Sequence, residues 1–208
     1  MDPLIAVGFV GNAFYFARFF VQWLQSERAR TSVVPIVFWW LSLGGAVCLG
    51  AYAYSVGDTP LFLGYALTFC IYLRNTAIAH LGPRAGRVDT LPALLAALIA
   101  GAALVWLASR RTMDGSVGAA WIAVAFLGQV IFSSRFIVQW YASEQIGRAH
   151  FPRAFWWISL AGNVLLLAYA VRRGDPVFIA GFALGPVVQV RNLMLSRERD
   201  SEAQSANA

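Results

Sequence analysis

The chain has 208 residues, of which 59% are hydrophobic and 12% carry a charge. An ordinary soluble domain has about 25% charged residues, so this composition excludes such a domain and predicts an integral membrane protein. The formal net charge of +6 at pH 7 comes from arginine, because the chain has no lysine. Without a soluble basic face to carry these charges, we expect no nucleic-acid partner.

Seven apolar stretches are long enough to cross a bilayer, which takes roughly 20 residues. We predict transmembrane helices, in chain order, at residues 4–24, 33–54, 59–80, 91–108, 117–141, 152–171 and 177–196. Short connections with turn residues separate them. Two of the connections carry a Gly-Asp pair, and we expect Asp58 and Asp175 to be turn or helix N-cap residues.

One pattern occurs twice in the chain. The string Arg-Phe-x-Val-Gln-Trp begins at Arg18 and again at Arg135, and the register then holds without a gap through the next two predicted helices. Self-similarity of this kind indicates a duplicated structural unit. Further matched strings begin at Pro35 and Pro152, at Gly57 and Gly174, and at Arg74 and Arg191.

The repeat sets the predicted domain organisation. Each copy contains three spans, and the span at 91–108 lies between them as a linker helix. Equivalent helices are four spans apart, so both copies enter the membrane in the same direction. We therefore predict an all-α fold of seven transmembrane helices in two parallel three-helix repeats, the arrangement of SWEET sugar transporters. The predicted boundaries are a first repeat at 1–82, a linker helix at 83–116, a second repeat at 117–197 and a disordered tail at 198–208.

The loops predict an orientation in the membrane. The loops on the side of the C-terminus carry more arginines than those on the opposite side. Positive charge gathers in cytoplasmic loops, so we expect the N-terminus outside and the C-terminus in the cytoplasm.

Four arginines lie inside predicted spans, where each costs roughly 2.5–3.5 kcal/mol on insertion scales. The repeat and the helical rise place them at one depth in the cytoplasmic half of the membrane. Guanidinium groups bind phosphate oxygens through a fixed fork of donors, so the four predict a pocket for a phosphate or pyrophosphate. The alternative is that they reach the headgroups or pair with Glu27 and Glu144. The four are Arg18, Arg74, Arg135 and Arg191.

Amides and tryptophans accompany these arginines. The amides would orient the head of a bound lipid, or else would satisfy the arginines and cap backbone groups. The tryptophans would line the way in from the membrane, or else would form an interfacial aromatic belt. The amides are Gln22, Asn75, Gln139 and Asn192, and the tryptophans are Trp39, Trp40, Trp156 and Trp157.

The two copies differ at a few positions. Ala46 of the first copy corresponds to Asn163 of the second, and Tyr72 corresponds to Gln189. A polar second half could face the polar head of an asymmetric lipid. No cluster of His, Cys or carboxylate residues lies in the arginine layer, so we expect no catalytic residue, no cofactor and no metal.

The repeated strings resemble a known family. The segments that begin at Arg18, Pro35, Gly57 and Arg74, with their second copies, are similar to the lipid-A-disaccharide synthase N-terminal-like domain family, which belongs with the SWEET and PQ-loop group. The resemblance implies a glycolipid pathway in the bacterial inner membrane. The soluble glycosyltransferase region of fused family members is absent from this sequence, so we expect the chain not to be an enzyme.

These observations predict a transporter or flippase for a phosphate-bearing glycolipid, such as a polyprenyl-phosphate-linked sugar used in lipid A or envelope glycan modification. The alternative is a non-catalytic membrane subunit that presents lipid to a glycosyltransferase. A carrier of free neutral sugars is disfavoured, because an uncharged sugar would leave the arginines uncompensated. The expected partners are an anionic glycolipid, membrane lipids and a glycosyltransferase.

Overall fold

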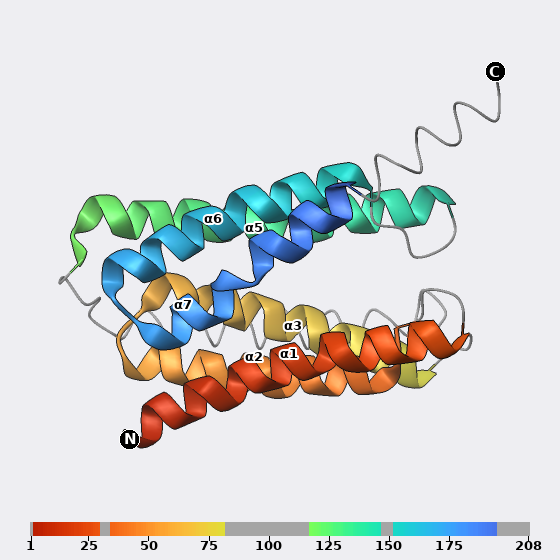
Figure 1. Cartoon of the computed structure of the whole chain (residues 1–208), viewed down its shortest axis with the longest axis horizontal. Coiled ribbons are helices and arrows are strands. Elements are labelled where there is room, and N and C mark those ends of the chain that lie inside the picture. Colours follow the sequence, from red (N-terminus) through yellow and green to blue (C-terminus); the bar gives the residue numbers. More distant parts are fainter. Residues whose placement is uncertain (1, 30–33, 82–116, 147–151, 195–208) are drawn as a thin grey trace. The chain divides into compact units, whose positions relative to one another are not determined.

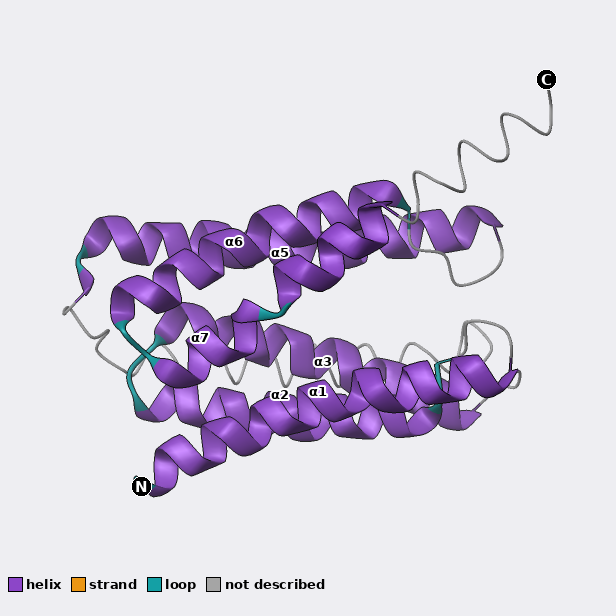
Figure 2. Cartoon of the chain, in the orientation of Figure 1, coloured by secondary structure: helices purple, strands orange, loops and turns teal. Residues whose placement is uncertain are grey.

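In the computed structural model, residues 2–29, 34–81, 117–146 and 152–194 are described. All regular structure of these residues is helical, and they contain no strand (Figure 2). The predicted all-α fold is confirmed for this part of the chain.

The helices follow the predicted spans closely. The labelled helices are α1 (Pro3–Ala29), α2 (Ile36–Ser55), α3 (Thr59–Leu81), α5 (Ala119–Ile146), α6 (Arg153–Arg173) and α7 (Pro176–Ala183). After a turn at Leu184, helix resumes over residues 185–194. The last predicted span, 177–196, was therefore expected as one helix and is instead interrupted. Pro186 gives the physical reason, because proline has no N–H to continue the backbone ladder.

Five helical segments of the described residues are long and apolar enough to cross a membrane. Large apolar side chains such as Phe20, Val130 and Ile137 are exposed on them, as a hydrocarbon solvent requires, so the chain is a membrane protein. Helix α3 coincides with the span predicted at 59–80, but its crossing of the membrane stays a prediction. The linker span at 91–108 lies outside the described residues, so the seven-helix arrangement also stays a prediction. The five segments are Pro3–Gln25, Ile36–Ser55, Ala119–Gln139, Arg153–Arg173 and Pro176–Met194.

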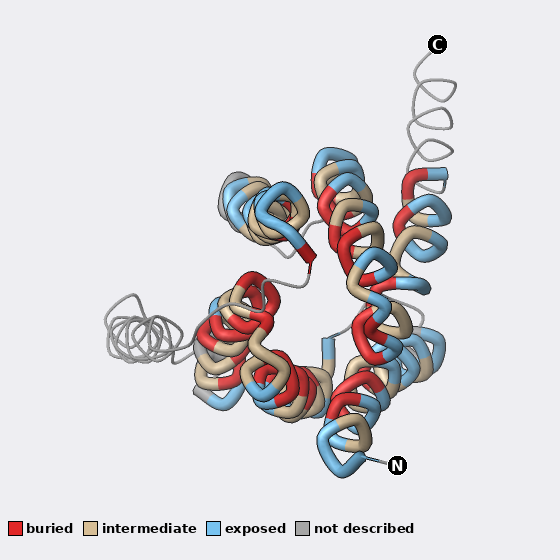
Figure 3. Tube along the Cα trace, turned by 90° about the vertical axis from the view of Figure 1, so that its left-hand side faces the viewer, coloured by how far each residue is buried: buried red, intermediate tan, exposed pale blue. Residues whose placement is uncertain are grey.

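The chain divides into two compact units, Met1–Asp114 and Gly115–Ala208. In the first unit, α2 packs against both α1 and α3 (Figure 1). In the second unit, α6 packs in the same way against α5 and α7. Within each unit the buried residues gather on the helix faces that meet, and the exposed ones face away (Figure 3). The predicted domain boundaries at 82, 116 and 197 stay predictions.

Matched glycines let the first two helices of each unit approach closely. A Cβ on Gly11 of α1 would lie 2.7 Å from Leu49 Cγ of α2. A Cβ on Gly162 of α6 would lie 2.6 Å from the backbone nitrogen of Phe132 of α5. The repeat partners of these two glycines, Gly128 and Gly45, are crowded at the same crossings. Small residues at helix crossings are typical of membrane proteins, and here the duplication has kept them.

The turn between the second and third helices is also duplicated. Gly57 and Gly174 have φ angles of 70° and 72°, a left-handed conformation that glycine adopts without strain. In the first unit the Asp58 carboxylate accepts from Leu61 N at 3.0 Å, and in the second the Asp175 carboxylate accepts from Val177 N at 3.0 Å. The prediction of turn and N-cap aspartates is confirmed, and both side chains are buried.

We expect Gly162→Ala to lower the free energy of unfolding by about 1–3 kcal/mol, because the new methyl group would meet backbone atoms that cannot move aside. Thermal unfolding of the purified chain in detergent measures this. Gly50→Ala is the control, since its Cβ would meet only Tyr65 Cβ at 3.5 Å and alanine favours helix by up to about 1 kcal/mol. Equal losses in the two variants would contradict the close crossing.

Candidate functional site

Arg18 of α1 is buried, with 8% of its surface exposed. Its guanidinium carbon lies over four aromatic rings that come from all three helices of the first unit. The distances from that carbon to the ring centroids are 4.1 Å for Tyr15, 4.8 Å for Phe19, 5.4 Å for Phe38 and 5.4 Å for Tyr72. All four lie within the range of cation–π attraction.

Two hydroxyl groups fix the orientation of this guanidinium. Arg18 Nη1 donates to Tyr72 Oη at 2.7 Å and to Ser42 Oγ at 3.2 Å. Ser42 in turn donates its own hydroxyl proton to the Phe38 carbonyl at 2.6 Å, which leaves its lone pairs for the arginine. We call Arg18 with Tyr15, Phe19, Phe38, Ser42 and Tyr72 the Arg18 cluster.

The free energy of the contacts in the Arg18 cluster is large enough to hold a charge in apolar surroundings. A desolvated cation–π contact contributes about 2 kcal/mol, and a hydrogen bond to a charged group contributes about 1.5–3 kcal/mol. Together they offset the roughly 2.5–3.5 kcal/mol that an arginine costs within a span. Arg18 therefore packs among groups of its own unit and does not pair with Glu27, which is exposed.

The positive charge of Arg18 has no carboxylate partner within the part of the chain that the structure describes. Its Nε–H group is buried and makes no hydrogen bond there. Buried charges in proteins are usually paired, and a buried donor without an acceptor is uncommon. Arg18 is thus a buried, oriented cation, and a bound anion would neutralise its charge.

The second unit keeps part of this arrangement. Arg135 of α5 lies over Phe132 at 3.3 Å and over Phe136 at 4.7 Å from the ring centroids, and these rings are the counterparts of Tyr15 and Phe19. Ser159, the counterpart of Ser42, bonds its own helix in the same way, to the Phe155 carbonyl at 2.6 Å. Arg135 is less buried than Arg18.

The structure describes the side chain of only one of the other two predicted arginines. Arg191 is exposed, and the side chain of Arg74 lies outside the described part of the structure. The two units are described separately, so the convergence of four arginines on one layer stays a prediction. Within the first unit, the structure brings Arg18 to Tyr72, which lies two residues before Arg74 on α3.

The predicted amides occupy less buried positions. Gln22, Asn75, Gln139 and Asn192 are all half-buried. Asn192 Nδ2 donates to the Val188 carbonyl of its own helix at 2.8 Å. Among described residues no hydrogen bond joins Gln22 to Arg18, although the two lie one turn apart on α1. Their role in binding a lipid head stays a prediction.

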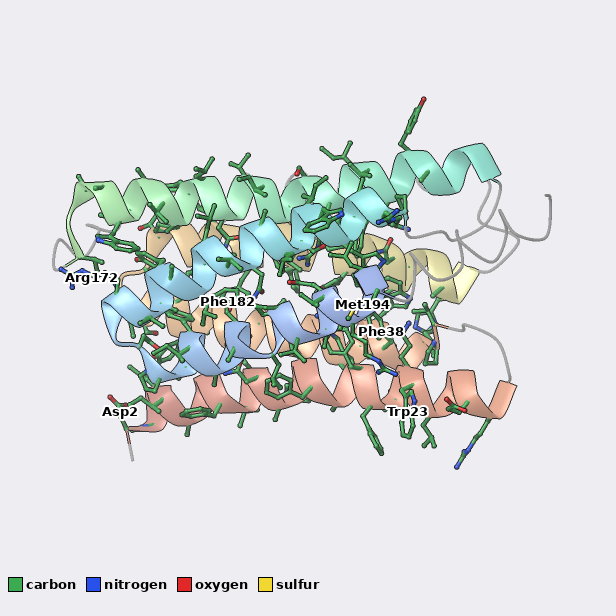
Figure 4. The ribbon with its side chains drawn as sticks, turned by 45° about the horizontal axis from the view of Figure 1, so that its top comes forward. Asp2, Trp23, Phe38, Arg172, Phe182 and Met194 are labelled. Carbon is green, nitrogen blue, oxygen red and sulfur yellow. The ribbon has the colours of Figure 1, made fainter. Side chains whose placement is uncertain are left out.

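The two tryptophans of each pair face different surroundings. Trp39 is half-buried, and its ring centroid lies 6.2 Å from that of Tyr72 and 5.1 Å from that of Phe38, so it packs beside the Arg18 cluster. Trp156 packs similarly against Phe155. Trp40 and Trp157 are 55% and 57% exposed. Trp23 of α1, which is 57% exposed, and Phe38 of α2 are labelled in Figure 4.

Sequence reasoning missed the residues that hold Arg18. Tyr15 and Ser42 come from polar positions that were not singled out, and Tyr72 was noted only as a difference from Gln189. One signal was available, because Tyr15 lies three residues before Arg18 and therefore shares its helix face. Nothing local in the sequence indicates that Ser42 and Tyr72 reach the same guanidinium.

Comparison with known proteins gives a family match. The model of the lipid A biosynthesis N-terminal domain matches residues 7–77 and again 124–194. A protein of Chlamydia caviae named lipid-A-disaccharide synthase is 32% identical over 206 residues, which cover 92% of this chain and 33% of the relative. A protein of Chlamydia trachomatis serovar D with the same name is 30% identical over 211 residues, covering 94% and 34% respectively. No solved structure matches.

These matches correct the predicted function, with its alternative, and the prediction that the chain is not an enzyme. The relatives carry the name of a synthase, which is an enzyme, over nearly the whole of this chain. The predicted transporter or flippase, its alternative of a non-catalytic lipid-presenting subunit, and the prediction that the chain is not an enzyme are therefore wrong. The chain spans about a third of the length of these relatives.

We expect Ser42→Ala to lower the free energy of unfolding by about 1.5–3 kcal/mol, because it removes an acceptor from a buried cation. Ser159→Ala is the matched control, since the same hydroxyl at the equivalent place bonds only a carbonyl of its own helix, and its loss should stay within about 0.5 kcal/mol. Thermal unfolding of both variants in detergent measures the difference. Equal losses would show that the Arg18 contact contributes nothing to stability.

Proposed function

Because the chain belongs to the lipid A biosynthesis N-terminal domain family, in two tandem copies, we propose that it acts in lipid A biosynthesis as the membrane domain of a lipid-A-disaccharide synthase. The observation that carries this proposal is the match of both repeats to the family, together with relatives of that name aligned along nearly the whole chain. Those relatives are about three times as long, so the proposal concerns the part of such a synthase that these helices form.

The apolar helices support a location in the bacterial inner membrane. The proposed arrangement has seven spans in two parallel repeats, with the N-terminus outside and the C-terminus in the cytoplasm. Its support is the even offset between equivalent helices and the excess of arginine in the loops on the side of the C-terminus. The arginine of each first helix then lies in the cytoplasmic half of the bilayer.

The proposed substrate is a phosphate-bearing glycolipid held by the Arg18 cluster. Three features of Arg18 support this: it is buried, its orientation is fixed by Ser42 and Tyr72, and its charge lacks a carboxylate partner among the described residues. A phosphate oxygen would accept from the buried Nε–H group, and a charge-assisted bond of this kind is strong in apolar surroundings. The apolar tail would then lie among the exposed apolar side chains of the helices.

The remaining predicted residues extend this proposed site. Arg135 would provide the equivalent contact in the second repeat, beside the more polar third helix that carries Gln189. The amides would form hydrogen bonds with the sugar hydroxyls of the head, because a few well-placed polar groups fix the orientation of a bound ligand. The residues that would complete the matched site of each repeat are Arg74, Gln22, Asn75, Trp39 and Trp40 in the first, and Arg191, Gln139, Asn192, Trp156 and Trp157 in the second.

We expect Arg18→Gln to reduce bound phosphate-bearing glycolipid at least about tenfold, because one charge-assisted hydrogen bond corresponds to that factor or more in affinity. The full chain is purified from bacterial membranes, and its lipids are extracted and quantified by mass spectrometry. Arg28→Ala is the control, since Arg28 is an exposed arginine in the last turn of the same helix. The melting temperature of each variant shows that it is folded, and equal lipid retention in all three proteins would contradict the site.

The activity is tested in cells. When the chain is depleted, we expect the lipid A disaccharide to fall and its monosaccharide lipid precursors to accumulate, because the joining step would lack its membrane domain. Mass spectrometry of the extracted lipids measures the ratio of the two. An unchanged ratio after depletion would contradict a role in disaccharide synthesis, whatever lipid the purified protein holds.

A further inference from the structure

The break in the last span distinguishes the two repeats. In the first repeat, α3 runs without interruption from Thr59 to Leu81. In the second, α7 ends at Ala183, Leu184 forms a turn, and helix resumes over residues 185–194. Figure 4 labels Phe182, just before the break, and Met194, at the end of the resumed helix.

The break frees one backbone carbonyl. In a continuous helix the N–H group of residue 186 would donate to the carbonyl of Phe182. Residue 186 is a proline, which has no N–H, whereas the first repeat has Phe69 at this place. A carbonyl without a donor is especially costly where water is absent.

A side chain from the neighbouring helix supplies the missing donor. Asn163 of α6 is buried, and its Nδ2 donates to the Phe182 carbonyl at 2.8 Å. We call this hydrogen bond the Asn163 bridge. The equivalent residue of the first repeat is Ala46, which offers no donor and faces an uninterrupted helix.

A glycine makes room for the Asn163 bridge. A Cβ on Gly185 would lie 2.6 Å from both the Nδ2 and the Oδ1 of Asn163, so any larger residue would displace the amide. The first repeat has Thr68 here, and its hydroxyl donates to the Gly64 carbonyl of its own helix at 2.7 Å. The residues at 163, 185 and 186, which differ from those of the first repeat, therefore act together. Pro186 removes a donor, Asn163 replaces it, and Gly185 leaves room for the amide.

The segment beyond the break contains a buried acceptor without a donor. Gln189 is 7% exposed, and its Oε1 makes no hydrogen bond within the described residues. A buried, unsatisfied amide oxygen is uncommon in a single settled structure. A tilt of residues 185–194 would change the surroundings of this oxygen.

We propose that Leu184 is a hinge in the last span and that the Asn163 bridge holds it in the present conformation. Release of the amide from the Phe182 carbonyl lets residues 185–194, which carry Gln189 and Arg191, tilt relative to α6. The hinge rests on the Asn163 bridge and the break alone, so it stands whether or not the proposed function is correct.

A double-mutant cycle on the full chain tests the bridge. Asn163→Leu removes the donor at similar side-chain size, and we expect it to lower the melting temperature in detergent by about 5 °C and to speed amide hydrogen exchange in residues 185–194. Pro186→Ala restores the backbone donor, so in that background Asn163→Leu should change neither quantity. Thr68→Ala is the control, because its carbonyl partner keeps a backbone donor.

Two outcomes would overturn the proposal. An equal effect of Asn163→Leu with and without Pro186→Ala would show that Asn163 does not replace the missing proline donor. A lower melting temperature without faster exchange in residues 185–194 would show a fixed contact rather than a hinge. Should Pro186→Ala fail to fold, Pro186→Phe provides the same backbone donor with the residue of the first repeat.

Discussion

The buried charge of Arg18 is the constraint around which the first repeat is built. The N–H donors of a guanidinium in apolar surroundings need acceptors, and its plane needs aromatic rings to lie against. No single helix supplies both the acceptors and the rings. Tyr15 and Phe19 come from α1, Phe38 and Ser42 from α2, and Tyr72 from α3. The three helices therefore meet at one cation. The glycine crossing at Gly11 and the cap at Asp58 bring them to the distance at which these contacts form.

The second repeat keeps the helix geometry of the first and has different side chains around its arginine. The crowded glycine crossing, the left-handed glycine turn and the aspartate cap all recur. Tyr72, however, is replaced by Gln189, and the third helix is broken five residues before it, at Leu184. The duplicated parts are those that set the helix geometry, while the differences gather where the third helix meets its neighbours. The two copies of the family domain in this chain thus have different internal surroundings around their matched arginines.

Features that depend on residues close in the chain could be predicted from the sequence, whereas contacts between residues far apart in the chain could not. Helix positions and the Asp58 and Asp175 caps follow from apolar length and from residues close in the chain, so they were predictable. The contact between Arg18 and Tyr72 joins residues far apart in sequence, and no pattern in one chain reveals it. Pro186 was visible as a difference between copies, but its effect depends on Asn163, which lies on another helix. The function was predicted wrongly from the arginines inside the spans, whereas the relatives aligned along nearly the whole chain carry the name of a synthase.

The fit between Asn163, Gly185 and Pro186 also limits the order in which a helix pair with the residues of the first repeat could acquire them. A proline introduced first at 186 would leave the Phe182 carbonyl without a donor. An asparagine introduced at 163 before the glycine would collide with the side chain at 185. The order with the smallest penalty is glycine, then asparagine, then proline, and each later change is tolerated only after the earlier one. A return to the residues of the first repeat is least costly in the reverse order.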